Sequence, residues 1–159
     1  MIRFGAPLAG FTWVKSSDGS IPPQAVQGGR EIDGKPLYIC RQWHKGGLHI
    51  GKTATHLNGC YIAYGGKEVF NKECYVLCGP ATQLRWIECK GKCVPKGWIP
   101  LEGGNEENGA ELWIGKVNHE NSEQLGKVSP NWDFGCNFGY DSREISLEQD
   151  QSYFVLAHL

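Results

Sequence analysis

The chain has 159 residues, 22 of them glycine, and a formal net charge of -1. Its length fits one domain or two small, closely packed ones, and a glycine content about twice the usual ~7% favours turns and strands over helices. The lack of any basic run argues against nucleic acid as a partner, and no apolar stretch approaches the ~20 residues of a membrane span.

Residues 1–12 are expected to form an N-terminal strand or extension. They lack the apolar core of about 7–15 residues that a secretory signal requires. We therefore expect a cytoplasmic protein, or one released by an unconventional route.

The rest of the chain contains one pattern twice. Residues 28–52 and 103–127 align without a gap, and nine of the 25 aligned positions are identical. The identical pairs are Gly28/Gly103, Gly29/Gly104, Glu31/Glu106, Gly34/Gly109, Leu37/Leu112, Ile39/Ile114, His44/His119, Gly51/Gly126 and Lys52/Lys127. Internal repeats determine the architecture, so we divide the chain into a first repeat at 13–78 and a second at 86–159.

Each repeat is expected to contain short strands only. Apolar and polar residues alternate over 37–42, and no segment shows sustained helical spacing. Asp33-Gly34 and Asn108-Gly109 are typical hairpin turns, and Trp13 and Trp86 are expected in the core. The predicted fold class is all-β, with two pseudo-symmetric antiparallel β-sheet repeats packed as a sandwich-like single unit.

An acid and a base recur in both repeats at the same spacing: Glu31 with Lys52, and Glu106 with Lys127. The glycines around them place all four near strand ends, in loops that a ligand can reach. A carboxylate accepts hydrogen bonds from neighbouring hydroxyls and an ammonium donates up to three, so a facing pair suits a vicinal diol. The alternative is a surface ion pair joining two loops, worth ~0–1 kcal/mol.

Other polar and aromatic residues are assigned structural roles. Lys67-Glu68 and Arg143-Glu144 keep their charges in both repeats, but adjacent strand residues point to opposite faces, which favours a salt bridge or loop anchor. His44 and His119 are interpreted as structural. Trp43 is expected in the core, although an exposed tryptophan beside a polar site could serve as a stacking platform.

Seven cysteines are present: Cys40, Cys60, Cys74, Cys78, Cys89, Cys93 and Cys136. Without a secretory signal, most are expected to be reduced and buried. Cys89 and Cys93 flank a possible tight hairpin that would bring their sulfurs together. A zinc site formed by Cys74, Cys78, Cys89 and Cys93 is the alternative, but the first two sulfurs would lie roughly 13 Å apart on a strand, too far for one tetrahedral ion. No metal or other cofactor is expected.

Common enzyme signatures are absent: the sequence has no phosphate loop, no His-Glu-x-x-His and no Gly-x-Ser-x-Gly. A glycosidase needs two carboxylates ~5–10 Å apart, whereas Glu31 and Glu106 fall in different repeats. A degenerate glycosidase and an intracellular interaction or scaffold domain remain as alternatives to a diol-binding protein.

Several motifs of the first repeat resemble the DM-nine (DM9) repeat family. They are Ile21-Pro22-x-x-Ala25-Val26-x-Gly28-Gly29, Leu37-Tyr38-Ile39-Cys40-Arg41, Gly51-Lys52, Tyr64-Gly65-Gly66-Lys67-Glu68 and Tyr75-Val76-Leu77. The second repeat departs from the signature, with Asp141-Ser142-Arg143-Glu144 in place of Gly-Gly-Lys-Glu.

The resemblance implies two all-β repeats, no enzymatic activity and a homodimer. Stand-alone members of the family include mannose-specific lectins with a role in innate immunity, in which an acidic residue and a lysine hold the sugar. These roles fall on Glu31 and Lys52, and on Glu106 and Lys127. The acidic residue is an aspartate in those lectins and a glutamate here, so its carboxylate stands about one bond length further out. The resemblance thus implies mannose or mannose-containing glycans as partners.

Overall fold

The computed structural model describes residues 5–159, so residues 1–4 of the predicted N-terminal extension lie outside the described residues. The only helical segments of the described chain are two short 3-10 turns, η1 (Thr55–Leu57) and η2 (Ala81–Gln83), and none of its helices is long and apolar enough to cross a bilayer. The first half contains β1 (Thr12–Ser17), β2 (Gln27–Arg30), β3 (Pro36–His44), β4 (Gly47–Ala54), β5 (Gly59–Tyr64), β6 (Lys67–Asn71) and β7 (Glu73–Cys78). The second half contains β8 (Leu84–Lys90), β9 (Gly104–Asn105), β10 (Glu111–His119), β11 (Ser122–Val128), β12 (Cys136–Tyr140), β13 (Arg143–Ser146) and β14 (Ser152–His158). The all-β prediction is confirmed.

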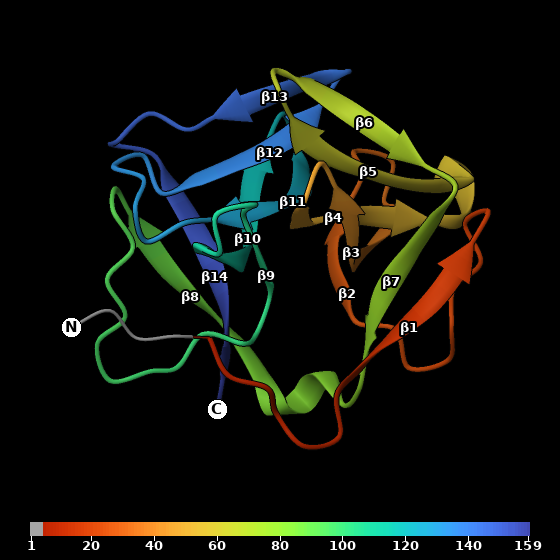
Figure 1. The fold of residues 1–159 in the computed structure, drawn as a ribbon, viewed down its shortest axis with the longest axis horizontal. Coiled ribbons are helices and arrows are strands. Elements are labelled where there is room, and N and C mark those ends of the chain that lie inside the picture. The colour runs from red at the N-terminus through yellow and green to blue at the C-terminus, as the bar shows by residue number, and fades with distance from the viewer. Residues whose placement is uncertain (1–4) are drawn as a thin grey trace.

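The strands form one antiparallel sheet that closes on itself like a barrel (Figure 1). From β3 the hydrogen-bonded order runs through β2, β11, β12, β13, β6, β5 and β4, and β4 pairs again with β3. β7 and β1 extend the sheet beyond β3, while β14 and β8 extend it beyond β10. Closure removes most free strand edges from the middle of the molecule.

The two halves repeat the same pairing, and in each half one short strand, β2 or β9, pairs both with its own half and with the other. Arg30 of β2 pairs with Glu123 of β11, and Asn105 of β9 pairs with Leu48 of β4, which is the equivalent contact 75 positions along. β6 and β13 meet between the halves, side by side at the top of Figure 1. The repeats are therefore pseudo-symmetric, and each completes the sheet of the other.

One hydrophobic cluster draws on both halves, with Leu37 and Ile39 of β3 beside Leu112 and Ile114 of β10. Trp13 and Trp86 pack against this cluster from its edge, partly buried as expected of core aromatics. The expectation for Trp43 is wrong: its side chain is 55% exposed, because it lies on β3 at a position that faces solvent.

Candidate functional site

Glu31 and Glu106 each begin a tight turn. The amide of Gly34 donates to the carbonyl of Glu31 at 3.0 Å, and the amide of Gly109 donates to that of Glu106 at 2.9 Å. Gly34 and Gly109 have φ of 90° and 89°, a conformation that glycine adopts without steric strain. The two predicted turns are confirmed, and they hold both carboxylates at equivalent places beyond β2 and β9.

Lys52 and Lys127 lie within β4 and β11, near the ends of these strands, so the prediction that they occupy exposed loops is wrong. Their exposed fractions are 5% and 2%. Each follows a glycine whose replacement would bring a Cβ within 2.1 Å of a carbonyl oxygen on the neighbouring strand, at Gly51 and Gly126. These glycines let β5 and β12 pack closely, and the lysines are buried inside the closed sheet.

The Lys52 cluster consists of Lys52, Glu68, Gln124, Glu31 and Tyr140. The ammonium of Lys52 donates to Gln124 Oε1 at 2.8 Å and to the Gly139 carbonyl at 3.0 Å, and its Nζ lies 3.2 Å from Glu68 Oε2. Gln124 Nε2 donates in turn to Glu31 Oε1 at 3.0 Å. Gln124 therefore separates the predicted acid from its lysine, and Lys52 makes two hydrogen bonds and one close ion pair, in which Glu68 Oε2 accepts no hydrogen bond.

The Glu31 carboxylate has a second partner, the ring of His56 at 3.0 Å. Burial raises the pKa of the Glu31 carboxyl, but the hydrogen bonds from His56 and Gln124, with the charge of Lys52, outweigh burial and leave the pKa below its ordinary value. Glu31 is thus ionised and held in place at neutral pH.

The Lys127 cluster consists of Lys127, Glu144, His49, Glu106 and Tyr64, the equivalent positions of the other half. Lys127 Nζ donates to His49 Nδ1 at 2.9 Å, whereas Glu144 Oε2 is 4.0 Å away, beyond hydrogen-bond range. Two ammonium hydrogens are left without an acceptor among the described residues. Burial lowers the pKa of Lys127, opposed by the charges of Glu144 and Glu106.

His49 stands where Gln124 stands in the other cluster. Burial, together with the nearby Lys127 charge, lowers the pKa of His49 to about 4, so its ring is neutral at pH 7 and its Nδ1 accepts. The ring lies edge-on to Tyr64 with centroids 5.1 Å apart, and Lys127 Nζ lies 5.6 Å from the centroid of the Tyr64 ring, so Lys127 contacts two aromatic rings.

The two glutamates that pair with lysine also anchor the opposite half. Glu68 Oε1 accepts from the Ser142 amide at 3.0 Å, and Glu144 Oε1 accepts from the Gly66 amide at 3.1 Å. The salt-bridge and loop-anchor role predicted for Glu68 and Glu144 is confirmed. The sequence did not indicate that their ionic partners are the two lysines of the proposed site.

A glycine lies beside the closer of the two ion pairs. A Cβ on Gly139 would lie 2.7 Å from Cγ and Oε2 of Glu68, so only glycine leaves room for Glu68 to approach Lys52. The equivalent residue of the first half is Ala63. The Lys127–Glu144 separation is the longer of the two, 4.0 Å against 3.2 Å for Lys52–Glu68.

An open pocket of about 500 Å³ lies beside the Lys127 cluster. It is lined by Lys45, His49, Tyr64, Glu106, Glu107 and Asn108. This volume lies within the range of small-molecule sites, ~300–1,000 Å³. Among the described residues no side chain donates to the Glu106 carboxylate, which leaves it available to a ligand, in contrast to Glu31.

His44 and His119 support the clusters as packing residues. The ring of His44 lies edge-on to Tyr64 at 4.8 Å, and that of His119 lies edge-on to Tyr140 at 4.7 Å. Their structural interpretation is confirmed. The repeat alignment contained Tyr64 and Tyr140 as a signal, but it could not reveal His49 and Gln124, because the two residues differ.

The zinc alternative of the sequence analysis is wrong. Cys74 packs with Cys40 in one cluster of the first half, while Cys93 packs with Cys136 in another cluster of the second half. All seven cysteines are free thiols in the structure. The Cys93 thiol lowers the pKa of Cys89, but residues 91–92 form only a bend and no strand follows them before β9, so the tight hairpin between the two cysteines is not formed.

The sequence profile of the DM9 repeat matches residues 6–71 and again residues 55–147. The chain belongs to the DM9 repeat family. Membership confirms the tandem-repeat assignment; the boundaries at 13–78 and 86–159 stay a prediction, because the two matches overlap. The all-β DM9 fold is of a non-enzymatic kind.

Among solved structures, the DM9 chain is similar to the crystal structure of the nematode sperm cell motility protein MFP2B. The TM-score is 0.57 at 13% sequence identity, and the match covers 94% of this chain and 44% of MFP2B. The likeness concerns the fold. None of the curated proteins compared with the chain matches it.

Proposed function

We propose that this DM9 protein is a carbohydrate-binding protein, a metal-independent lectin of mannose type. The observation that supports the proposal is the pair of equivalent clusters, each with a carboxylate on a surface turn and a buried lysine behind it. Glu31 and Glu106 accept from sugar hydroxyls, and Lys52 and Lys127 provide the positive charge. No reaction is catalysed and no cofactor takes part.

The Lys127 cluster is the stronger binding site of the two. Glu106 lines an open pocket, and Lys127 retains hydrogens without acceptors behind His49 and Tyr64. A sugar hydroxyl reaches the ammonium when the His49 ring turns aside. In the Lys52 cluster the same movement would break the bonds of Gln124 to both Lys52 and Glu31, so that site binds more weakly.

Weak sites gain strength from being linked. Two clusters on one chain, doubled in a homodimer, raise the avidity for a surface that carries many mannose residues. This favours a role in pattern recognition or agglutination. We place the protein in the cytoplasm, from which unconventional release would bring it to external glycans.

A second candidate is an intracellular interaction or scaffold domain without glycan binding. The observation that favours it is the burial of both lysines, with Lys52 making two hydrogen bonds and an ion pair within the protein itself. The similar fold of a protein named for sperm cell motility agrees with a non-lectin role.

Retention on mannan-agarose separates the two. The lectin is retained in the presence of a chelator and eluted by free mannose. Glu106→Gln removes most of the retention and Glu31→Gln removes less. Glu73→Gln, which alters an exposed carboxylate paired with Lys15 at 3.4 Å, serves as the control and leaves retention unchanged.

Failure of the wild-type protein to bind mannan at high density supports the scaffold. Equal loss of mannan retention in the Glu106→Gln and Glu73→Gln variants would refute the assigned binding site. It would not refute glycan binding by the protein. Elution by chelator alone would refute metal independence.

A further inference from the structure

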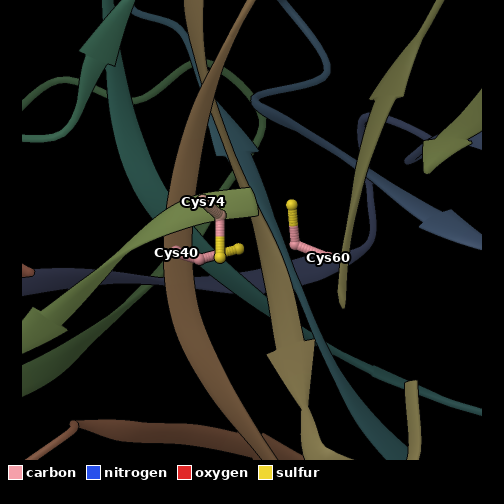
Figure 2. A group of neighbouring side chains, drawn as sticks. All are labelled: Cys40, Cys60 and Cys74. Carbon is pink, nitrogen blue, oxygen red and sulfur yellow. The ribbon is translucent and has the colours of Figure 1, made fainter. Parts of the chain in front are cut away.

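Three cysteines from separate strands meet inside the first half. Cys40 of β3, Cys60 of β5 and Cys74 of β7 place their sulfur atoms within 4.8 Å of one another (Figure 2). Their exposed fractions are 0%, 0% and 3%. Among residues 5–159 this is the only group of three or more cysteine, histidine or acidic side chains with such spacing.

Packing alone does not require this triad. The equivalent positions of the second half hold Gly115, Cys136 and Tyr153, so only one of the three sulfurs has a counterpart. A Cβ on Gly115 would lie 2.9 Å from the sulfur of Cys136. One half therefore fills the space without a thiol triad, while the other gathers three.

We propose that Cys40, Cys60 and Cys74 form a buried site for a monovalent soft metal ion, Cu(I). Thiolate is the ligand that Cu(I) and zinc favour. Structural zinc requires four ligands, and among the described residues no fourth cysteine, histidine or carboxylate joins the group. The nearby hydroxyl of Thr53 already donates to the Gly59 carbonyl at 2.8 Å. Three sulfurs complete the trigonal coordination of Cu(I).

The geometry needs only a small contraction. Corners of a triangle with 4.8 Å sides lie about 2.8 Å from its centre, so an inward shift of about 0.5 Å gives the ~2.3 Å of a metal–thiolate bond. β3 and β5 belong to the closed part of the sheet and β7 extends it beyond β3, with Cys74 at the start of β7 beside the exposed Glu73. An ion enters by local opening of this strand end.

The three sulfurs bind the ion as thiolates, because the thiolate is the metal-binding form of cysteine. Binding therefore releases their three protons to solvent. Before the ion binds, the thiol of Cys60 donates to the Glu73 carbonyl at 3.6 Å, and this hydrogen bond is lost when Cys60 gives up its proton.

Competition with the Cu(I) chelator bicinchoninate tests the site, using the reduced full chain under anaerobic conditions. Wild type is expected to remove one Cu(I) per chain from the chelator. Cys40→Ala and Cys74→Ala should weaken binding at least 100-fold. Cys78→Ala is the matched control, because Cys78 is buried in the same cluster but lies outside the triad; it should bind as wild type does.

X-ray absorption of the wild-type copper complex tests the site without any variant. We expect three sulfur ligands at ~2.3 Å and no nitrogen or oxygen ligand. Failure of wild type to compete, an equal loss in Cys78→Ala, a coordination shell with nitrogen or oxygen, or preferential uptake of Zn(II) would each overturn the assignment. The test is independent of the lectin proposal.

Discussion

Replacement of each buried lysine by methionine should affect stability very unequally, although the two lysines occupy equivalent positions. Lys52 donates two hydrogen bonds and lies 3.2 Å from a glutamate oxygen, whereas Lys127 donates one hydrogen bond and lies 4.0 Å from its glutamate. At an effective dielectric constant of about 20, the Coulomb energies of the two ion pairs at these distances differ by about 1 kcal/mol. One more hydrogen bond to a charged donor adds about 1.5–3 kcal/mol.

We therefore expect Lys52→Met to lower the free energy of unfolding by about 2–4 kcal/mol more than Lys127→Met does. Lys52→Met also leaves the Glu68 carboxylate buried without its counter-charge, since that side chain is only 11% exposed. Urea unfolding followed by tryptophan fluorescence measures both values. In the double variant Lys52→Met/Glu68→Gln, part of the loss should be recovered.

Equal effects of the two lysine variants, within about 0.5 kcal/mol, would refute this reasoning. A larger effect of Lys127→Met would contradict the hydrogen-bond assignment itself. Unchanged urea m-values are the control that both variants unfold from a comparable native state.

Three further perturbations follow from the same contacts. Gly139→Ala should destabilise the fold by about 1–3 kcal/mol through overpacking against Glu68, and thermal unfolding should show a lower Tm; an unchanged Tm would mean that Glu68 can move aside freely. Because the pKa of His49 is about 4 in the folded protein and near 6.5 when unfolded, the unfolded chain binds the proton first, and stability should fall by about 1–3 kcal/mol between pH 6.5 and 4. His49→Gln, which installs the residue of the other cluster, should flatten that pH profile in urea titrations, and a profile with the wild-type slope would assign the effect elsewhere. Trp43→Ser should change the free energy of unfolding by no more than about 0.5 kcal/mol, as for an exposed residue, and a larger loss in the urea midpoint would place Trp43 in a contact.

The repeat made the fold predictable because six of its nine identical pairs, four of glycine and two of leucine or isoleucine, serve the backbone or the core. Gly34 is required by a positive φ, and Gly51 by the closeness of a neighbouring carbonyl. Such constraints apply equally to both repeats, so the residues that are identical when the two repeats are aligned mark the constrained positions. The exposure of Trp43 was not predictable in this way, because the second copy has asparagine there.

The composition of the candidate site was only partly predictable, because its contacts form between repeats. Lys52 was identified from the repeat, yet its partners Glu68 and Gln124 depend on how the halves close. Gln124 is histidine in the other half, so no identity marked the position. A sequence pattern records which residues recur, whereas the Lys52–Glu68 ion pair needs the space left by Gly139 on the opposite half.

The pairing of β2 and β9 with strands of the opposite half has a consequence for the origin of the chain. Every lysine cluster takes its lysine from one half and a hydrogen-bonding partner from the other. An ancestor with a single repeat would have needed two identical subunits to build the same body, with two identical sites. In a single chain the two halves can differ in sequence, so one site can close around its lysine while the other stays open.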